Sequence, residues 1–280
     1  MPKRALPVFF ISHGAPTHAV ADSAAARFWA RIPEMLDAPV RCVLVVSAHW
    51  EARALTLAGR TASPRIQHDF YGFPETLYRL SWPLPDGRET GEWLKARLVE
   101  ILEDVQEDPS RLLDHGVWVP LMRAWPKMPY PVFQLSLVAG WRGEDYLRLG
   151  AHLGALREEG VLLVGSGGIV HNLAELDRRH SLAEPAHWAQ AFVQAVEVAL
   201  ASRDTEALLD PWALPHGRRA HPTREHYWPL LVALGAAEGP MVAWFRAWEM
   251  GTLAMHAFRD FRLSSKSMHA DTPPWHDCCA

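Results

Sequence analysis

Short apolar runs alternate along this chain with longer segments whose apolar residues recur at helical spacing. The runs are rich in Val, Leu, Ile and Phe and bounded by Gly, Pro or Ser, which is typical of buried strands; they cover residues 7–11, 40–47, 132–137, 161–164 and 241–245. The helical spacing covers residues 21–36, 89–102, 144–156, 187–200 and 225–234. This alternation predicts an α/β fold with a central sheet and helices on both of its faces.

The chain shows no internal repeat and no Gly/Ser-rich linker along its 280 residues. We therefore predict a single catalytic domain over residues 1–263 and a loose tail over residues 264–280, which holds two prolines and a final Cys pair. Residues 61–86 contain four prolines and five aromatic residues, which predicts a long ordered excursion over one end of the sheet. Such an excursion often covers a binding site.

Charge and cysteine content exclude several classes of protein. The 28 basic and 32 acidic residues form no long run of either sign, which argues against a nucleic-acid or membrane-surface partner. Three cysteines, with Cys42 inside an apolar run, are too few for a disulfide framework and fit a reducing compartment. The N-terminal apolar stretch is short and broken by Pro7, and no run approaches the ~20 residues of a membrane helix, so we predict a cytoplasmic protein.

Three histidines follow predicted strands. His13 comes after the first run in ISHGAP, His49 follows the second in SAHW, and His171 follows residues 161–164 across a glycine-rich turn. Ligands of open α/β sheets bind outside the carboxyl ends of the strands, where loops can converge without disturbing the packed layers. We therefore expect these three rings at one rim of the sheet.

Further histidines lie in loops with strong turn signals. His115 stands between Asp114 and Gly116 in the string LDHGVWVPL, and His221 and His226 belong to HPTREHYWPL. Thr223 is a plausible N-cap, which would place Glu225 and His226 in a first helical turn. A ring in a first turn can point outward into a cleft, so these histidines are candidates for the same rim.

Each of these histidines has a structural and a functional interpretation. A single histidine at a strand end is usually a hydrogen-bonded packing residue. Convergence of five at one rim favours function instead, because imidazole is the commonest metal ligand and titrates near neutrality. His68, in QHDFYGFP, is left open between packing and substrate contact. For the other histidines we favour packing or surface roles; they are His18, His152, His180, His187, His216 and His256.

Nucleotide binding and covalent catalysis lack good candidates. The Gly-Ser-Gly-Gly turn at residues 165–168 resembles a phosphate-binding loop but lacks its spacing and its lysine. Ser166 does not stand in a nucleophile elbow, and Cys42 lies within a predicted strand.

Six motifs, read in order, resemble those of a known enzyme class. They are HGAP, SAHW, HDFYGFP, DHGVWVPL, GSGGIVHNL and PTREHYWPL, the last followed by EMGTLAM. Together they resemble the class III extradiol ring-cleavage dioxygenases, in particular the DOPA 4,5-dioxygenase-like branch, from about His13 to Met255. The resemblance implies a mixed central sheet and a mononuclear metal site at the carboxyl-end rim.

The resemblance also implies roles for individual residues. His13, His49 and His226 correspond to metal ligands, with Glu225 as an alternative third ligand that we place instead behind His226. His171 corresponds to the acid/base histidine and His115 to a second histidine of the pocket. A neutral imidazole can accept a proton from a catechol and return it later.

The implied reaction inserts O2 into a DOPA-like or other substituted catechol and gives a muconic-semialdehyde-type product. The expected partners are a small aromatic diol and O2, and the expected cofactor is one divalent metal without an organic group, as Fe(II) for catalysis or Zn(II) as bound. Two alternatives remain at this stage. One is a zinc hydrolase that uses the same three histidines, and the other is a relative that binds a ligand without turnover.

Overall fold

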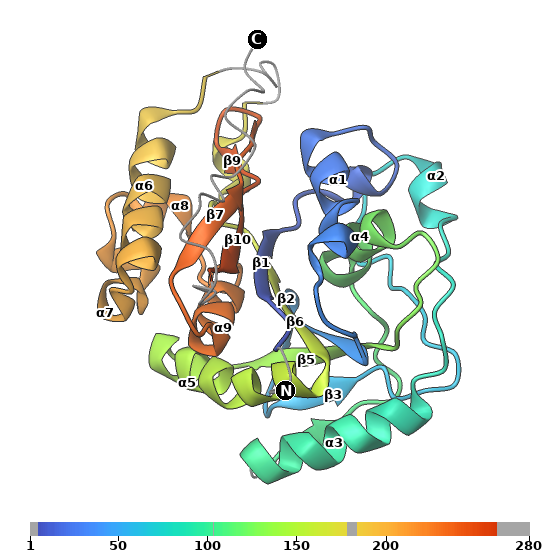
Figure 1. The fold of residues 1–280 in the computed structure, drawn as a ribbon. Helices are drawn as coiled ribbons and strands as arrows, with labels where there is room; N and C mark the ends of the chain where they lie inside the picture. The colour runs from blue at the N-terminus through green and yellow to red at the C-terminus, as the bar shows by residue number, and fades with distance from the viewer. Residues whose placement is uncertain (1–4, 103, 178–183, 262–280) are drawn as a thin grey trace.

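A mixed sheet of eight strands lies at the centre of the molecule (Figure 1). The computed structural model describes residues 5–102, 104–177 and 184–261. The sheet contains β1 (Val8–Ser12), β2 (Cys42–Ala52), β3 (Thr56–Ala58), β4 (Gln106–Glu107), β5 (Val132–Val138), β6 (Val161–Gly167), β7 (Met241–Phe245) and β10 (Ala257–Asp260). A separate two-stranded ribbon pairs β8 (Trp248–Glu249) with β9 (Leu253–Ala254).

Four neighbouring parallel strands form the middle of this sheet. The strand order is β4-β3-β5-β2-β6-β1-β10-β7, and the run from β5 to β1 is parallel throughout. The sheet is mixed, as the resemblance implied, because β3 is antiparallel to β5 and β10 is antiparallel to both β1 and β7. The carboxyl ends of β2, β6 and β1 therefore lie side by side at one rim.

Helices cover both faces of the sheet, as predicted. They are α1 (Ala24–Trp29), α2 (Glu75–Tyr78), α3 (Arg88–Leu102), α4 (His115–Ala124), α5 (Gly143–Leu153), α6 (His187–Ser202), α7 (Thr205–Leu208), α8 (Gly217–Ala220) and α9 (Trp228–Ala236). Short 3-10 turns are η1 (Pro16–Ala19), η2 (Ile32–Met35), η3 (Gly154–Glu159), η4 (Leu173–Glu175) and η5 (Pro211–Ala213).

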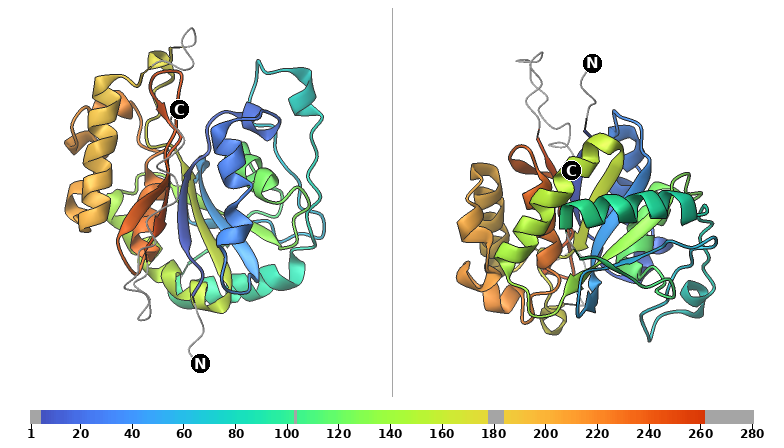
Figure 2. Two further views of the ribbon diagram at one scale, coloured as in Figure 1. Left: turned by 45° about the horizontal axis from the view of Figure 1, so that its top comes forward. Right: turned by 90° about the horizontal axis from the view of Figure 1, so that it is seen from below.

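Alternate side chains of β1 show how the two layers of core are built. Val8 and Phe10 pack into the core that α5, α6 and α9 cover, whereas Phe9 and Ile11 pack into the core that α1 and α4 cover. Figures 1 and 2 show these two groups of helices on opposite sides of the strands. Burial of each side chain of this size contributes roughly 1.5–3 kcal/mol to the stability of the fold. Because one continuous sheet carries both cores, they form a single domain.

The structure corrects three of the predicted elements. The helix expected over residues 21–36 is split into α1 and η2, because Pro33 has no N–H to donate to the carbonyl of Trp29 and so interrupts the α-helical hydrogen bonds. The last predicted helix begins at Trp228, with Pro229 in its first turn, so Thr223 is not its N-cap. The strand expected to end at residue 47 continues to residue 52, which places His49 inside β2 rather than beyond it.

Two of the sequence-based predictions concern residues that the structure does not describe. The predicted tail over residues 264–280 and His180 lie outside the described residues. Across the described ranges, every helix is too short or too polar to cross a lipid bilayer.

Candidate metal centre

Histidines from three separate elements meet at the carboxyl-end rim of the sheet. His13 follows β1, His49 lies in β2, and His226 lies in the turn before α9. One ring nitrogen from each lies within 4.8 Å of the others, and the Nε2 atoms of His13 and His49 are 2.9 Å apart. Two nitrogens bound at a right angle and about 2.1 Å from one metal ion would be about 3 Å apart, so this spacing suits a shared ligand.

The other ring nitrogen of His13 has a fixed partner. Its Nδ1 lies 2.9 Å from the hydroxyl of Ser166, which itself donates to the carbonyl of Gly116 at 2.5 Å. That carbonyl is available within α4 because Pro120, four residues later, has no N–H to donate to it. Since the serine hydrogen is used, Nδ1 of His13 must be the donor, which leaves Nε2 with a free lone pair.

His226 is oriented by a carboxylate. Its Nδ1 lies 3.0 Å from Glu225 Oε1, an oxygen that also accepts a hydrogen bond from the hydroxyl of Thr223 at 2.9 Å. Its Nε2 is buried and has no hydrogen-bond partner. A histidine whose Nδ1 is held by a carboxylate presents Nε2 as a ligand, and a metal ion there would satisfy the unpaired buried atom.

A buried polar network supports the β2 side of the cluster. The carbonyl of His49 accepts a hydrogen bond from Arg111 at 3.1 Å, and Arg111 lies 3.5 Å from the carboxylate of Asp114. Asp114 is fully buried and also accepts hydrogen bonds from Ser47 and Gln134. Burial raises the pKa of the Asp114 carboxyl. Several donors therefore compensate for the loss of water around this group.

The glycines at the end of β6 allow a second segment to approach the strand closely. A Cβ atom at Gly165 would lie 2.2 Å from the carbonyl oxygen of Pro229, and one at Gly167 would lie 2.1 Å from that of His226. The N–H of Gly168 donates to the same carbonyl of His226 at 3.0 Å. These glycines therefore place His226 beside His13, whose N–H donates to the carbonyl of Gly167 at 3.0 Å.

Two further predicted histidines border the cluster. The ring of His171 stacks on that of His226, with centroids 3.3 Å apart and planes at 7°. The ring of His115, the first residue of α4, lies 4.0 Å from the ring of His49. His221 does not join them, because it is fully buried and its Nε2 donates to the carbonyl of Ile169 at 2.7 Å.

Burial controls the charge of the clustered rings. Removal from water, reinforced by neighbouring histidines, holds the pKa of His13 and of His226 well below the usual value. The same causes lower the pKa of His49 to about 3, and burial lowers the pKa of His171. The rings are therefore neutral near pH 7, which is the form that binds a metal ion or accepts a proton.

The roof segment, residues 61–86, reaches the cluster through Asp69, which the sequence analysis did not single out. Its Oδ1 accepts the backbone N–H of His115 at 2.9 Å, and its Oδ2 lies 3.0 Å from Nδ1 of that ring. The only sequence signal was its place beside His68 in an aromatic motif. The ring of His68 packs against Phe70 and Trp118.

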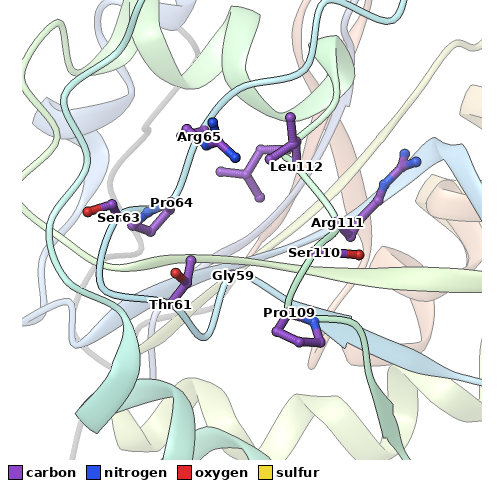
Figure 3. A pocket seen from close by; sticks show the side chains of 10 residues that line it. Gly59, Thr61, Ser63, Pro64, Arg65, Pro109, Ser110, Arg111 and Leu112 are labelled. Atoms are coloured by element: carbon purple, nitrogen blue, oxygen red, sulfur yellow. The ribbon is translucent and has the colours of Figure 1, made fainter.

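A pocket of about 150 Å³ lies at the base of the roof segment (Figure 3). Figure 3 shows Thr61, Ser63 and Arg65 on one side and Pro109 to Leu112 on the other. None of the lining residues is a histidine, but Arg111, which lines the pocket, donates a hydrogen bond to the carbonyl of His49 at 3.1 Å.

Comparison with known proteins agrees with this geometry. Residues 7–250 match the family model described as "Catalytic LigB subunit of aromatic ring-opening dioxygenase". The chain belongs to this family. It is 34% identical over 258 residues to the 4,5-DOPA dioxygenase extradiol of Escherichia coli (strain K12), covering 89% of this chain and 93% of that protein.

Other relatives of this LigB-family chain extend the likeness to plants and to a solved structure. The 4,5-DOPA dioxygenase extradiol of Beta vulgaris is 35% identical over 237 residues, which cover 82% of this chain and 86% of the relative. The crystal structure of an uncharacterized Escherichia coli K12 protein has a TM-score of 0.76 at 30% identity, over 91% of this chain and 100% of that one. The chain is therefore an extradiol ring-cleaving dioxygenase, and its family implies a bound metal.

Proposed function

We propose that His13, His49 and His226 hold one Fe(II) ion, and that the enzyme uses it to cleave the ring of a DOPA-like or other substituted catechol with O2. The observation that carries this proposal is the orientation of two of the rings. Ser166 and Glu225 occupy the Nδ1 atoms of His13 and His226. Both rings therefore present Nε2 toward a common point.

The metal and the protein have distinct tasks in this proposal. A bound Fe(II) supplies the redox chemistry with dioxygen that Zn(II) lacks. His171 accepts a proton from a catechol hydroxyl and returns it to the product, because its lowered pKa keeps the ring neutral near pH 7. His115 contacts the substrate from its place next to the ring of His49.

Glu225 serves as the outer partner of His226 rather than as the third ligand. Its Oε1 is already engaged by the ring of His226 and the hydroxyl of Thr223. A carboxylate in this position raises the basicity of the ligating imidazole and fixes its direction. Replacing Glu225 by Gln should weaken metal binding by roughly 10- to 100-fold without abolishing it.

The substrate class is proposed from the relatives, four of which, from Escherichia coli, Beta vulgaris, Portulaca grandiflora and Mirabilis jalapa, are named 4,5-DOPA dioxygenase extradiol. Phe70 lies 6.0 Å from the ring of His115 and 6.2 Å from that of Trp118, which provides an aromatic wall beside the cluster. Such a wall suits a planar aromatic diol.

The test is oxygen consumption by protein reconstituted anaerobically with Fe(II) and mixed with DOPA and a panel of substituted catechols. We expect stoichiometric oxygen uptake and a yellow semialdehyde-type product with at least one catechol, and neither with the zinc-loaded protein. Absence of uptake with every catechol, at one iron per chain, would contradict the proposal. Zinc-dependent hydrolysis of esters or amides would instead support a hydrolase.

A further inference from the structure

Asp69 and His115 are joined by two hydrogen bonds that reach from the roof segment to the first residue of α4. The carboxylate accepts the backbone N–H of His115 through Oδ1 at 2.9 Å, and its Oδ2 lies 3.0 Å from the ring Nδ1. The two side chains are 14% and 10% exposed, so water competes weakly for these bonds. Asp69 thus occupies the N-terminal end of a ten-residue helix whose own N-cap residue, Asp114, makes no side-chain cap.

The backbone of the roof segment holds Asp69 in this place. The N–H of Gln67 donates to the carbonyl of Leu113 at 2.7 Å, and the N–H of Leu113 donates to the carbonyl of Arg65 at 3.0 Å. The indole N–H of Trp118 donates to the carbonyl of Gln67 at 2.8 Å. Residues 65–67, just before Asp69, are therefore bonded to residues on both sides of His115, namely Leu113 and Trp118, and the pair does not depend on one flexible side chain.

The contact determines which nitrogen of His115 carries hydrogen. Burial alone would raise the pKa of the Asp69 carboxyl, but its hydrogen bonds with His115 outweigh burial and lower that pKa. The carboxylate is therefore ionised near pH 7 and can only accept hydrogen bonds. Nδ1 must be the donor in this contact, so a His115 ring that carries a single hydrogen carries it on Nδ1 and keeps the lone pair of Nε2.

We propose that Asp69 is a positioning residue, which fixes His115 in the tautomer with hydrogen on Nδ1 and thereby makes Nε2 an acceptor for a hydroxyl of the bound catechol. The ring that is positioned in this way lies 4.0 Å from the ring of His49 and 5.3 Å from that of His13, at the edge of the metal centre. The catalytic part of the proposal rests on the proposed dioxygenase function. The tautomer itself does not.

Asp69→Asn is the informative substitution because it preserves size while reversing one hydrogen bond. The amide oxygen can still accept the backbone N–H of His115, which directs the NH2 group toward Nδ1. Nδ1 would then accept, and a ring with a single hydrogen would carry it on Nε2 instead. A comparable change of carboxylate to amide, at the residue that holds the catalytic histidine of Ser-His-Asp proteases, lowers kcat by ~10⁴-fold because the histidine then adopts the wrong tautomer.

The first experiment reads the tautomer without any turnover. Zinc-loaded, diamagnetic protein labelled with ¹⁵N-histidine is compared with its His115→Gln variant, which assigns the signal of His115 by its disappearance. We expect shifts of a protonated Nδ1 and an unprotonated Nε2 in the wild type, and the reverse in Asp69→Asn. A wild-type His115 with hydrogen on Nε2 would overturn the proposal even if the variant failed to fold.

The second experiment measures turnover of the iron-loaded protein. We expect Asp69→Asn to lower kcat by on the order of 10²- to 10⁴-fold, with metal content unchanged and KM within about threefold, and Asp69→Glu to restore part of kcat. Asp86→Asn is the matched control, since Asp86 is an exposed acid of the same roof segment that pairs with Arg88. A kcat for Asp69→Asn within threefold of wild type would overturn the proposal, whereas a wild type inactive on all catechols would count against the dioxygenase function alone.

Discussion

The metal centre combines two regions that hold their histidines in different ways. His13 directly follows β1 and donates its N–H to the carbonyl of Gly167 in β6, and His49 lies inside β2, which pairs with β6 and β5 on either side. His115, His171 and His226 lie outside the strands, and each depends on particular polar contacts with neighbouring segments. We call these the strand half and the loop half of the centre.

This difference in how the backbone is held predicts different effects of substitutions in the two halves. A strand position is determined by many backbone bonds at once, so loss of a single side chain leaves its neighbours in place. A loop position depends on a few contacts, such as the carbonyl of His226 with the N–H of Gly168. We therefore expect substitutions of His13 and His49 to remove the metal, and substitutions in the loop half, apart from those of the proposed ligand His226, to alter geometry or proton transfer.

Loss of a strand-half ligand should have the largest effect. His13→Ala should reduce activity on the order of 10³-fold or more and remove bound metal, because a metal ion contributes several kcal/mol to catalysis. Elemental analysis and oxygen uptake measure both. His152→Ala, at an exposed position of α5, is the matched control and should behave as wild type. Full metal occupancy in His13→Ala would show that His13 is not a required ligand and would contradict the distinction between the two halves.

Loss of close packing between the two halves should have the second-largest effect. Gly167→Ala would place a Cβ atom 2.1 Å from the carbonyl oxygen of His226, and relief of this overlap should cost about 3 kcal/mol of unfolding free energy and displace the ring. Gly168→Ala is the adjacent control, because its nearest contact would be 3.6 Å. Denaturant unfolding and metal stoichiometry check this, and equal stability of the two variants would contradict the role of Gly167.

Removal of a loop-half ring that binds no metal should affect turnover alone. His171→Ala should lower kcat by roughly 10²- to 10⁴-fold with about one metal per chain retained, because the proton acceptor is lost while the three proposed ligands remain. Single-turnover oxygen uptake together with iron analysis separates the two effects. Loss of iron from this variant would make His171 a ligand instead.

The smallest effect concerns stability at low pH. Burial lowers the pKa of His221 to about 4 and that of His256 to about 3, whereas an unfolded histidine titrates near 6.5. Below about pH 6.5 the unfolded chain binds more protons, so stability falls as pH falls, by about 1.4 kcal/mol per pH unit for each such group. This loss continues until the native pKa is reached.

Denaturant unfolding of metal-free protein at pH 7, 6 and 5 measures this slope. His256→Gln, beside β10, and His221→Gln, at the end of α8, should each make the slope shallower by about one proton. An unchanged slope in either variant would show that the ring is already protonated, or exposed, in the folded state.

The strand half could be predicted from the sequence and much of the loop half could not. The rule that ligands bind beyond the carboxyl ends of strands placed His13 at the rim, because buried strands have a clear apolar signature. His49 was expected just beyond its strand, but β2 continues past it with an irregular register against β5. Local sequence does not record where such an irregularity falls.

In the loop half, the motifs identified the histidines but not what holds them. Asp69 contacts His115 across 46 residues of chain, and the link from Pro120 through Gly116 to Ser166 joins α4 to β6. The glycines at the end of β6 were considered as a phosphate-binding loop and rejected, and their close approach to residues 226–229 emerges only when both segments are placed together. Tertiary contacts of this kind leave no periodicity in the sequence.

Anomalous diffraction at the iron absorption edge, from crystals loaded anaerobically with Fe(II), tests the central claim most directly. We expect a single peak per chain about 2.1 Å from the Nε2 atoms of His13, His49 and His226, with Glu225 outside bonding distance. The structure also offers His49 with Asp69 and His115, and His171 with Glu225 and His226, as clusters that could hold a metal. A peak centred on either of those clusters would contradict the account.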